Sequence, residues 1–181
     1  MVPDAANILL VCADGHVSVV SADDSEKKLM DIKVTAAGPL QLECGDYSKD
    51  GRSVALGGQL TDNGESIGWV YTISQDERTQ PHLHCTIKGH DAGGIRSVAF
   101  LPDSPYVVTG GADGATIAWN WQPQRRQTDP MQAYEAFQFM VDGDVNAHRA
   151  QINSLTVSST GSIATASDDG TAIVWKNPFT E

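Results

Sequence analysis

The 181-residue sequence is short of basic residues and lacks any apolar run long enough to cross a membrane. Lysine and arginine number 12 against 23 aspartates and glutamates, which gives a formal net charge of −11. A field of that sign repels phosphate backbones and anionic membrane surfaces. A membrane-spanning helix needs about 20 apolar residues, whereas the apolar runs here have the length of strands. The sequence therefore predicts a soluble protein with neither a nucleic-acid nor a membrane partner.

The N-terminus also lacks the basic segment of a secretory signal, and its short apolar run ends at Asp14 and Gly15. Cysteine is scarce, since Cys12, Cys44 and Cys85 form an odd, widely spaced set in apolar surroundings. Such a set favours buried, reduced thiols over a disulfide framework. We therefore expect a cytoplasmic protein.

Helical periodicity is almost absent, and short β-rich runs separated by Gly and Asp predict an all-β fold. The one stretch that could be helical, 129–140, begins with a proline at its second position. Its alternating Phe137 and Phe139 favour a loop followed by a strand. Fourteen strands are expected, at 8–13, 16–20, 28–34, 40–47, 53–57, 67–73, 82–88, 95–101, 106–110, 116–121, 136–141, 152–158, 162–167 and 171–176.

Internal repeats decide how these strands are grouped. Residues 95–121 and 152–176 share one pattern: an apolar strand, a polar turn, a second strand, an Asp-Gly hairpin and a third strand that closes on Trp. A fainter copy covers 40–58, and a truncated copy, ILLVCADGHVSVV, opens the chain. Self-similarity of this kind is the signature of a repeat architecture, and each copy predicts a small antiparallel meander.

The repeats resemble those of the WD-repeat (beta-transducin-like) family. The resemblance rests on the Asp-Gly hairpins and on Gly89, His90, His148, Trp119 and Trp175. It covers nearly the whole chain and is specific from about residue 89 onward. It implies a WD-type β-propeller. We expect about 3.5 to 4 blades of four-stranded antiparallel meanders, which form an incomplete ring. The expected division of the single segment 1–181 is a partial blade at 8–34, blades at 40–88 and 95–141, and a partial blade at 152–176.

The resemblance also implies a buried hydrogen-bonded tetrad of His, Thr, Asp and Trp in each of two blades. These tetrads are His90, Thr109, Asp113 and Trp119 in one blade, and His148, Thr165, Asp169 and Trp175 in the other. In both, Thr precedes Asp by four residues and Trp follows it by six. An Asp can accept from the His, whose other ring nitrogen can pair with the Thr hydroxyl, and that hydroxyl can accept from the indole N–H. We expect each tetrad to fix the geometry of its blade.

The first two repeats depart from the family pattern. Val20 and Val70 are expected at the sites that match the Trp, and no His precedes either repeat, so apolar packing alone should hold these blades. The two tetrad Trp residues are followed by Asn120 and Lys176 where the family has Asp.

A His, a Thr and an Asp can also be interpreted as a base, a nucleophile and an orienting group. Against a catalytic role, each Thr lies inside a strand, no neighbouring glycine-rich turn offers an oxyanion hole, and the set occurs twice at equivalent repeat positions. We therefore expect the tetrads to be structural and the chain not to be an enzyme.

Metal and cofactor sites find little support. His82 and His84 share one strand face with Cys85 on the other, without further ligands at zinc spacing. The calcium-like run 142–146 is followed by Ala147 where a calcium loop needs Gly, and its twelfth position is Asn153 in place of Glu. No metal and no other cofactor is predicted.

Two connections are longer than a hairpin needs. Residues 58–66 carry Asp62 and Asn63, and residues 122–135 carry Arg125 and Arg126, the only adjacent arginines in an acidic chain. Binding residues gather on loops held by a rigid scaffold, so these four are the candidate partner-binding residues. For the arginine loop we expect an acidic peptide or protein face as the partner. The alternative is that both connections are tolerated surface insertions.

The sequence thus predicts a non-catalytic scaffold for proteins or peptides. The alternative is a regulatory or substrate-presenting propeller portion of a larger multidomain enzyme, which the same loops would serve. Four blades are at the lower end of the range for closed propellers, and the first and last blades each lack a strand. We expect a second copy of the chain, another protein or the remainder of a longer propeller to complete the ring.

Overall fold

The computed structural model describes residues 7–21, 28–73, 80–122, 131–139 and 147–179. These residues form fifteen β-strands and no helix, so the predicted all-β class is confirmed. The strands are β1 (Asn7–Val11), β2 (His16–Ser21), β3 (Lys28–Lys33), β4 (Leu40–Tyr47), β5 (Ser53–Leu60), β6 (Ser66–Thr72), β7 (His82–Ile87), β8 (Ile95–Phe100), β9 (Tyr106–Gly111), β10 (Thr116–Asn120), β11 (Met131–Gln132), β12 (Tyr134–Phe139), β13 (Ile152–Val157), β14 (Ile163–Ser167) and β15 (Ala172–Trp175).

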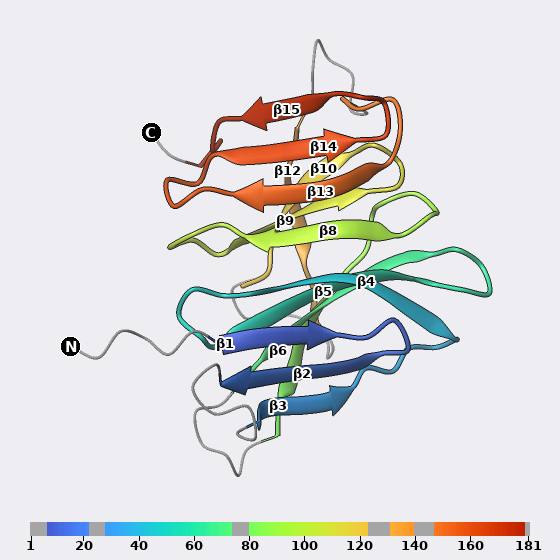
Figure 1. Ribbon diagram of the computed structural model, residues 1–181, viewed down its shortest axis with the longest axis vertical. Coiled ribbons are helices and arrows are strands. Elements are labelled where there is room, and N and C mark those ends of the chain that lie inside the picture. The colour runs from blue at the N-terminus through green and yellow to red at the C-terminus, as the bar shows by residue number, and fades with distance from the viewer. Residues whose placement is uncertain (1–6, 22–27, 74–79, 123–130, 140–146, 180–181) are drawn as a thin grey trace.

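Four sheets follow one another along the long axis of the molecule, with sheet 1 at one end and sheet 4 at the other (Figure 1). Their strand orders are β1-β2-β3 in sheet 1, β11-β7-β6-β5-β4 in sheet 2, β12-β10-β9-β8 in sheet 3 and β13-β14-β15 in sheet 4. Apart from β11, every strand pairs antiparallel with its neighbour. Each sheet is therefore a meander, as the repeats predict, with β11 added at one edge of sheet 2.

A tight turn between successive strands in each of sheets 1, 3 and 4 contains an Asp-Gly pair. Gly15, Gly114 and Gly170 have φ values of +95°, +79° and +80°. This left-handed region costs glycine little but is unfavourable for residues with a Cβ. The turns therefore set the same register in sheets 1, 3 and 4.

Three apolar clusters fill the spaces between successive sheets. The first cluster contains Val17 and Val19 of sheet 1 with Trp69 of sheet 2, the second contains Val70 of sheet 2 with Trp119 of sheet 3, and the third contains Ala118 of sheet 3 with Trp175 of sheet 4. The central strands β5, β6, β9 and β10 are consequently buried on both faces. Burial of apolar area between sheets is the main source of stability for such a stack.

The edge strands β4, β8 and β13 of sheets 2, 3 and 4 lie side by side, since β4 contacts β8 and β8 contacts β13. We call these three strands the inner strands. Polar ties join these inner strands from sheet to sheet. The Phe100 N–H donates to Asp46 Oδ2 at 2.8 Å, and the Leu155 N–H donates to Ser97 Oγ at 2.9 Å. The inner strands therefore form a continuous wall on one side of the stack.

The structure corrects the predicted loop at 58–66. β5 continues to Leu60 and β6 begins at Ser66, which leaves a hairpin over 61–65 only. The strands extend because Leu60 and Ile67 are buried in the cluster between sheets 1 and 2. The turn residues thus indicated a longer loop than tertiary packing allows.

β11 was not predicted. It pairs in parallel with β7 of sheet 2, although β10 and β12, the strands before and after it, belong to sheet 3. The Ala133 N–H donates to the Thr86 carbonyl at 2.8 Å, and Ala133 is buried with Trp121. The chain therefore pairs with the neighbouring sheet at β11 before β12 begins, and β12 begins two residues earlier than the expected start at 136.

The cysteines are all free, but they are not all buried. Cys85 is buried and Cys44 is half-buried, whereas Cys12 is exposed in the hairpin of sheet 1. The expectation of three buried thiols was wrong for Cys12, because sheet 1 has a neighbouring sheet on one face only among the described residues.

Candidate functional site

The structure brings the four predicted residues of sheet 3 together. His90 lies in the connection before β8, Thr109 on β9, Asp113 in the β9–β10 hairpin and Trp119 on β10. The His90 Nδ1 lies 3.0 Å from Asp113 Oδ2, and its Nε2 lies 2.6 Å from Thr109 Oγ1. The indole N–H of Trp119 donates to the same hydroxyl at 2.7 Å. The four side chains therefore form one hydrogen-bonded chain from the hairpin to the core.

Sheet 4 repeats this arrangement. His148 Nδ1 lies 3.1 Å from Asp169 Oδ2, and His148 Nε2 lies 2.8 Å from Thr165 Oγ1. The Trp175 indole N–H donates to Thr165 Oγ1 at 3.1 Å. One difference is that Thr171, which follows the hairpin, donates its hydroxyl to Asp169 at 2.6 Å. The sheet 3 position is occupied by Ala115, which donates only its backbone N–H to the Asp.

The electrostatics of the tetrads favour ionised carboxylates. Burial alone raises the pKa of Asp113, but the hydrogen bond and charge of His90 and two backbone N–H donors outweigh it, so the pKa is lowered. For Asp169 the Thr171 hydroxyl and the Arg149 backbone N–H hold the pKa well below its usual range. An ionised Asp is the better acceptor for a His N–H.

Neither tetrad is open to a substrate. The side chains of His90 and His148 are both 0% exposed, and Thr109 and Thr165 are buried. Each Thr hydroxyl already contacts a His nitrogen and an indole N–H. A nucleophile needs access to a reacting atom as well as a base, so this arrangement supports blade geometry and not acyl transfer.

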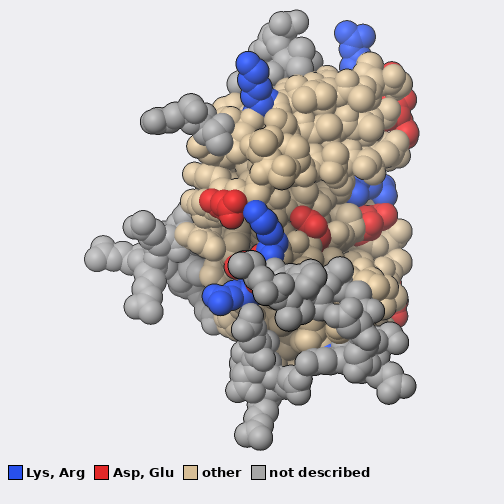
Figure 2. Space-filling model, turned by 60° about the vertical axis from the view of Figure 1, so that its left-hand side comes forward, with Lys and Arg blue, Asp and Glu red and all other residues tan. Residues whose placement is uncertain are grey.

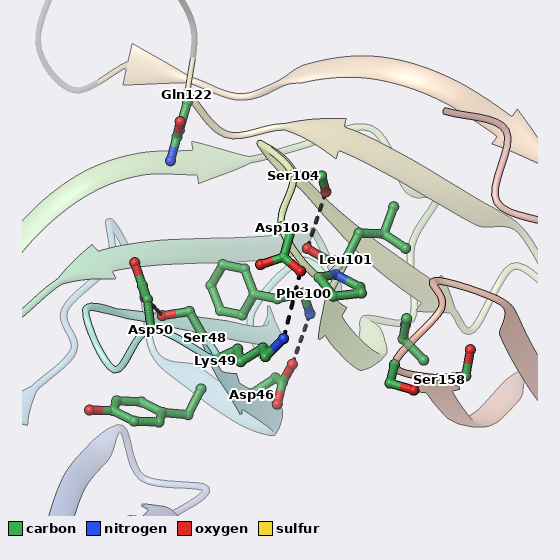
Figure 3. Close-up of a pocket in the computed structure, with 14 residues that line it drawn as sticks. Asp46, Ser48, Lys49, Asp50, Phe100, Leu101, Asp103, Ser104, Gln122 and Ser158 are labelled. Atoms are coloured by element: carbon green, nitrogen blue, oxygen red, sulfur yellow. Dashed lines mark hydrogen bonds and ion pairs between the residues drawn. The ribbon is translucent and has the colours of Figure 1, made fainter. Parts of the chain in front are cut away.

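A groove lies at the opposite ends of the inner strands from the tetrad hairpins. It is formed where the connections between the first and second strands of sheets 2, 3 and 4 converge, at 48–52, 101–105 and 158–162, and we call it the hairpin groove. Its volume is about 670 Å³. Figure 3 shows Asp46, Lys49 and Asp103 facing the same space between these hairpins, with Phe100 in the wall.

Charged groups line this groove. Lys49 Nζ lies 3.6 Å from Asp103 Oδ2, and both side chains are exposed. Asp46 is half-buried, and burial raises the pKa of its carboxyl group despite hydrogen bonds from the backbone of Phe100 and Tyr47. In Figure 2, acidic and basic side chains form a band across the middle of the molecule, below a broad uncharged area.

A second, smaller hollow continues from the groove along the inner strands. It measures about 290 Å³, and it shares Asp46, Phe100 and Val157 with the groove. Small side chains, including those of Ser97 and Ala99, line its wall. Because they share Asp46, Phe100 and Val157, the two hollows make one continuous cleft along the inner strands.

The family model for the WD domain, G-beta repeat, matches residues 82–120 and 142–176. These two matches, together with the all-β fold, support a WD-repeat family for the chain. The first matched repeat spans β7 of sheet 2 and β8 to β10 of sheet 3, so sequence repeats and sheets are offset by one strand. Comparison of the chain with curated proteins finds no match.

The strand register shows which residues take the Trp position in the first two sheets, most of which lie outside the matched repeats. Val20 pairs with Ile8 in sheet 1, the register expected for that position. The prediction for sheet 2 was wrong: Val70 faces sheet 3, while Tyr71 pairs with Val54 as Trp119 pairs with Val107. A one-residue shift in a strand moves a side chain to the other face, and the extended β5–β6 hairpin concealed that shift.

Apolar packing is also not the only interaction that holds the second WD blade. The Ser66 hydroxyl donates to the Asp91 carbonyl and accepts the Gly94 N–H, at 3.0 Å in the latter case. Both partners lie in the connection to sheet 3. A polar tie between blades thus accompanies the apolar cluster.

The candidate partner-binding residues are only partly within the described chain. Arg125 and Arg126 lie outside the described residues, as do Asp142, Asp144 and Asn146. Asp62 and Asn63 are exposed in the hairpin 61–65. The Asn63 side chain accepts the Glu65 N–H at 2.9 Å, which gives it a local role in the turn.

The residues considered as metal ligands, His82, His84 and Cys85, differ in their exposure to solvent. His82 is exposed, Cys85 is buried, and the half-buried His84 packs edge-on against Trp121 with ring centroids 5.5 Å apart. Within the described ranges no group of three or more His, Cys, Asp or Glu residues could hold a metal ion. The same ranges contain no helix that could span a membrane.

The hairpin groove was not predicted from the sequence. One signal for it was present: Asp46 stands at an inner-strand position where the other repeats have Ala99 and Thr156. Burial of a carboxylate is unfavourable, so an Asp at a half-buried position where other repeats have Ala or Thr indicates a specific role. The convergence of three hairpins around it depends on the stacking of the sheets and could not be seen in the sequence.

Proposed function

We propose that this chain is a non-catalytic scaffold that holds other proteins or peptides in the cytoplasm. The observation that carries the proposal is the hairpin groove, a cleft of about 670 Å³ built from three successive blades. Binding sites are concave and are carried by loops on a rigid support. Here the support is the WD-repeat stack, which holds the three hairpins together through inter-blade hydrogen bonds.

The tetrads support this proposal because their polar groups are not available to bind a partner. Their His, Thr and Asp side chains are turned inward and bonded to one another, so they are committed to the blades. The groove, in contrast, is lined by carboxylate, amine and hydroxyl groups, among them the exposed side chains of Lys49 and Asp103. That lining suits recognition of a polar surface.

Charge and cysteine chemistry support the class of partner and the compartment. The net charge of −11 opposes binding to phosphate backbones. All three cysteines are free, as expected where thiols are kept reduced. Protein or peptide partners and a cytoplasmic location follow as proposals.

Site-specific photo-cross-linking in cells tests the scaffold. A photoreactive amino acid replaces Ser159, which lines the groove and is exposed, or Ala92, which is exposed before β8 at the other end of the inner strands. We expect Ser159 to cross-link a defined protein and Ala92 not to cross-link it. Cross-linking of that protein from Ala92 alone would reject the groove, and the absence of specific products from both sites would reject the scaffold.

We also propose that further blades cover the two ends of the stack. Ile8 and Leu10 on sheet 1 are 48% and 49% exposed, and Val174 on sheet 4 is 77% exposed. The matching faces of sheets 2 and 3 are covered by a neighbouring sheet, and uncovered apolar faces favour association. Size-exclusion chromatography with light scattering should show the isolated chain as an oligomer or as an aggregate. A stable, folded monomer would contradict this proposal.

A further inference from the structure

We propose that the hairpin groove binds a basic segment of a partner protein, with a Lys or Arg side chain directed at Asp46 and the ring of Phe100. This inference rests on the proposed scaffold function and names the chemistry of its partner. It follows from the shape of the cleft, the charges around it and the position of Asp46.

The balance of charge favours a cation. Three carboxylates line the groove, those of Asp46, Asp50 and Asp103, and Lys49 is the one amine among the lining residues. Asp50 accepts from the Ser48 hydroxyl at 2.7 Å and from the Arg52 N–H at 3.0 Å. The groove therefore has an excess of negative charge even when Lys49 is counted.

Lys49 is bound weakly enough to be displaced. Its contact with Asp103 is 3.6 Å long, and the two side chains are 74% and 84% exposed. Exposed ion pairs contribute little, typically below about 1 kcal/mol. An incoming Lys or Arg can replace Lys49 beside Asp103, because the exchange of one cation for another keeps the local charge balanced.

Asp46 lies deeper than the other two carboxylates. It sits at the junction of the groove and the smaller hollow, where Phe100 and Val157 also contribute to the wall. A cation beside Asp46 would offset the cost of keeping a carboxylate half-buried, and the Phe100 ring would add a favourable contact with that cation.

The half-buried position of Asp46 favours a long side chain as its partner. The groove spans three hairpins and suits a stretch of main chain, whereas Asp46 lies at the junction with the smaller hollow. A Lys or Arg side chain has an apolar stem and a charged tip. From a main chain in the groove, the stem can lie along the wall that contains Phe100 while the tip reaches Asp46.

Binding of short fluorescent peptide pools to the full chain tests this inference. Each pool has one central residue, Lys, Arg, N-acetyl-lysine, Gln or Glu, with degenerate flanks. We expect the Lys and Arg pools to bind about tenfold more tightly than the acetyl-lysine and Gln pools, as for one charge-assisted contact. Equal affinity for all pools, or preference for Glu, would overturn the inference.

Three variants sharpen the result. Asp46→Asn keeps an acceptor for the Phe100 N–H, so it should fold, but it should abolish the preference for Lys and Arg over Gln. Lys49→Ala should strengthen binding of the Lys pool. Asp168→Asn, on the hairpin at the other end of sheet 4, is the matched control and should retain the preference. Loss of the preference in the control, its retention in Asp46→Asn, or weaker binding by Lys49→Ala would contradict the assignment.

Two further measurements separate the possible failures. Free spermidine should compete poorly with the Lys pool, and competition at equal strength would overturn a peptide site in favour of a site for small cations. Cross-linking from Ser159 distinguishes the two proposals. A cross-linked partner whose contact segment lacks Lys and Arg would reject the basic segment and keep the scaffold, and no cross-linked partner would reject both.

Discussion

The two halves of the molecule reach the same architecture by different means. Sheets 3 and 4 each contain a buried hydrogen-bonded tetrad, and the family model matches this half together with β7 of sheet 2. Sheets 1 and 2 place Val20 and Tyr71 in the register of the Trp and pack around an apolar cluster instead. The meander register is common to both halves. It follows that a blade of this chain can form without a tetrad, from hairpin geometry, apolar stacking and, in sheet 2, the polar tie made by Ser66.

The hairpin residue Asp14 illustrates the difference between the two halves. It occupies in sheet 1 the hairpin position that Asp113 occupies in sheet 3. Without a His from the preceding segment, it contacts His16 at 2.7 Å and Lys33 at 3.1 Å and remains 60% exposed. The same residue in the same turn is therefore a surface group in one half and part of a buried network in the other.

The largest expected effect is at Trp119. Its side chain is 1% exposed and donates to Thr109, so Trp119→Ala should lower the free energy of unfolding by about 3–5 kcal/mol. Tyr71→Ala, at the equivalent register but half-buried, should cost less. Urea denaturation measures both. Equal losses would remove the distinction between the halves, and Trp119→Phe gives a milder test if the alanine variant does not fold.

The next effect separates Asp113 from Asp14. Asp113→Ala leaves His90 Nδ1 without its partner in a buried site, which should cost about 1–3 kcal/mol. Asp14→Ala should change the melting temperature little, because its contacts are exposed. A similar fall in melting temperature for both variants would show that the hairpin Asp acts through the turn and not through the tetrad.

The pH dependence of this effect has a defined sign. The pKa of Asp113 is lowered in the folded state, so its contribution is present above the unfolded value of about 4 and is lost as the pH falls through the folded pKa. The difference in melting temperature between wild type and Asp113→Ala should therefore shrink below about pH 4. A difference that grows on acidification would contradict the sign of the shift.

A smaller effect of opposite sign is expected at Asp46. Burial raises its pKa, so the ionised carboxylate destabilises the fold above the raised pKa, and this cost disappears as the pH falls below the unfolded value of about 4. Asp46→Asn should raise the melting temperature at pH 7 and have little effect at pH 3. A lower melting temperature at pH 7 would mean that the bond to Phe100 outweighs the cost of burial.

The smallest effect concerns thiol reactivity. Burial raises the pKa of the thiols of Cys44 and Cys85 to about 12, whereas Cys12 is exposed. A thiol reacts as the thiolate, so one cysteine, Cys12, should react rapidly with a maleimide in the native protein and all three should react in denaturant. Mass spectrometry of labelled Cys12→Ser provides the control, and rapid native labelling of that variant would show that sheet 2 opens easily.

The sequence predicted most of the strands and the members of both tetrads, for a local reason. Period-two alternation, Asp-Gly turns and the spacing of Thr, Asp and Trp act within one hairpin. It failed where a longer hairpin changed the face of a side chain, as at Tyr71, and where a segment crossed to another sheet, as β11 does. Both failures depend on contacts between residues far apart in the chain.

By itself, the sequence determined the all-β class, the repeat and the identity of the tetrad residues, because each of these depends on patterns that recur over short distances. Only the tertiary structure decided which residues share an interface and which hairpins meet. Asp46, Lys49 and Asp103 come from two repeats and gather in one groove because the sheets stack in order along the inner strands. That stacking is set by the burial of apolar faces between neighbouring sheets, a property of the assembled chain rather than of any single segment.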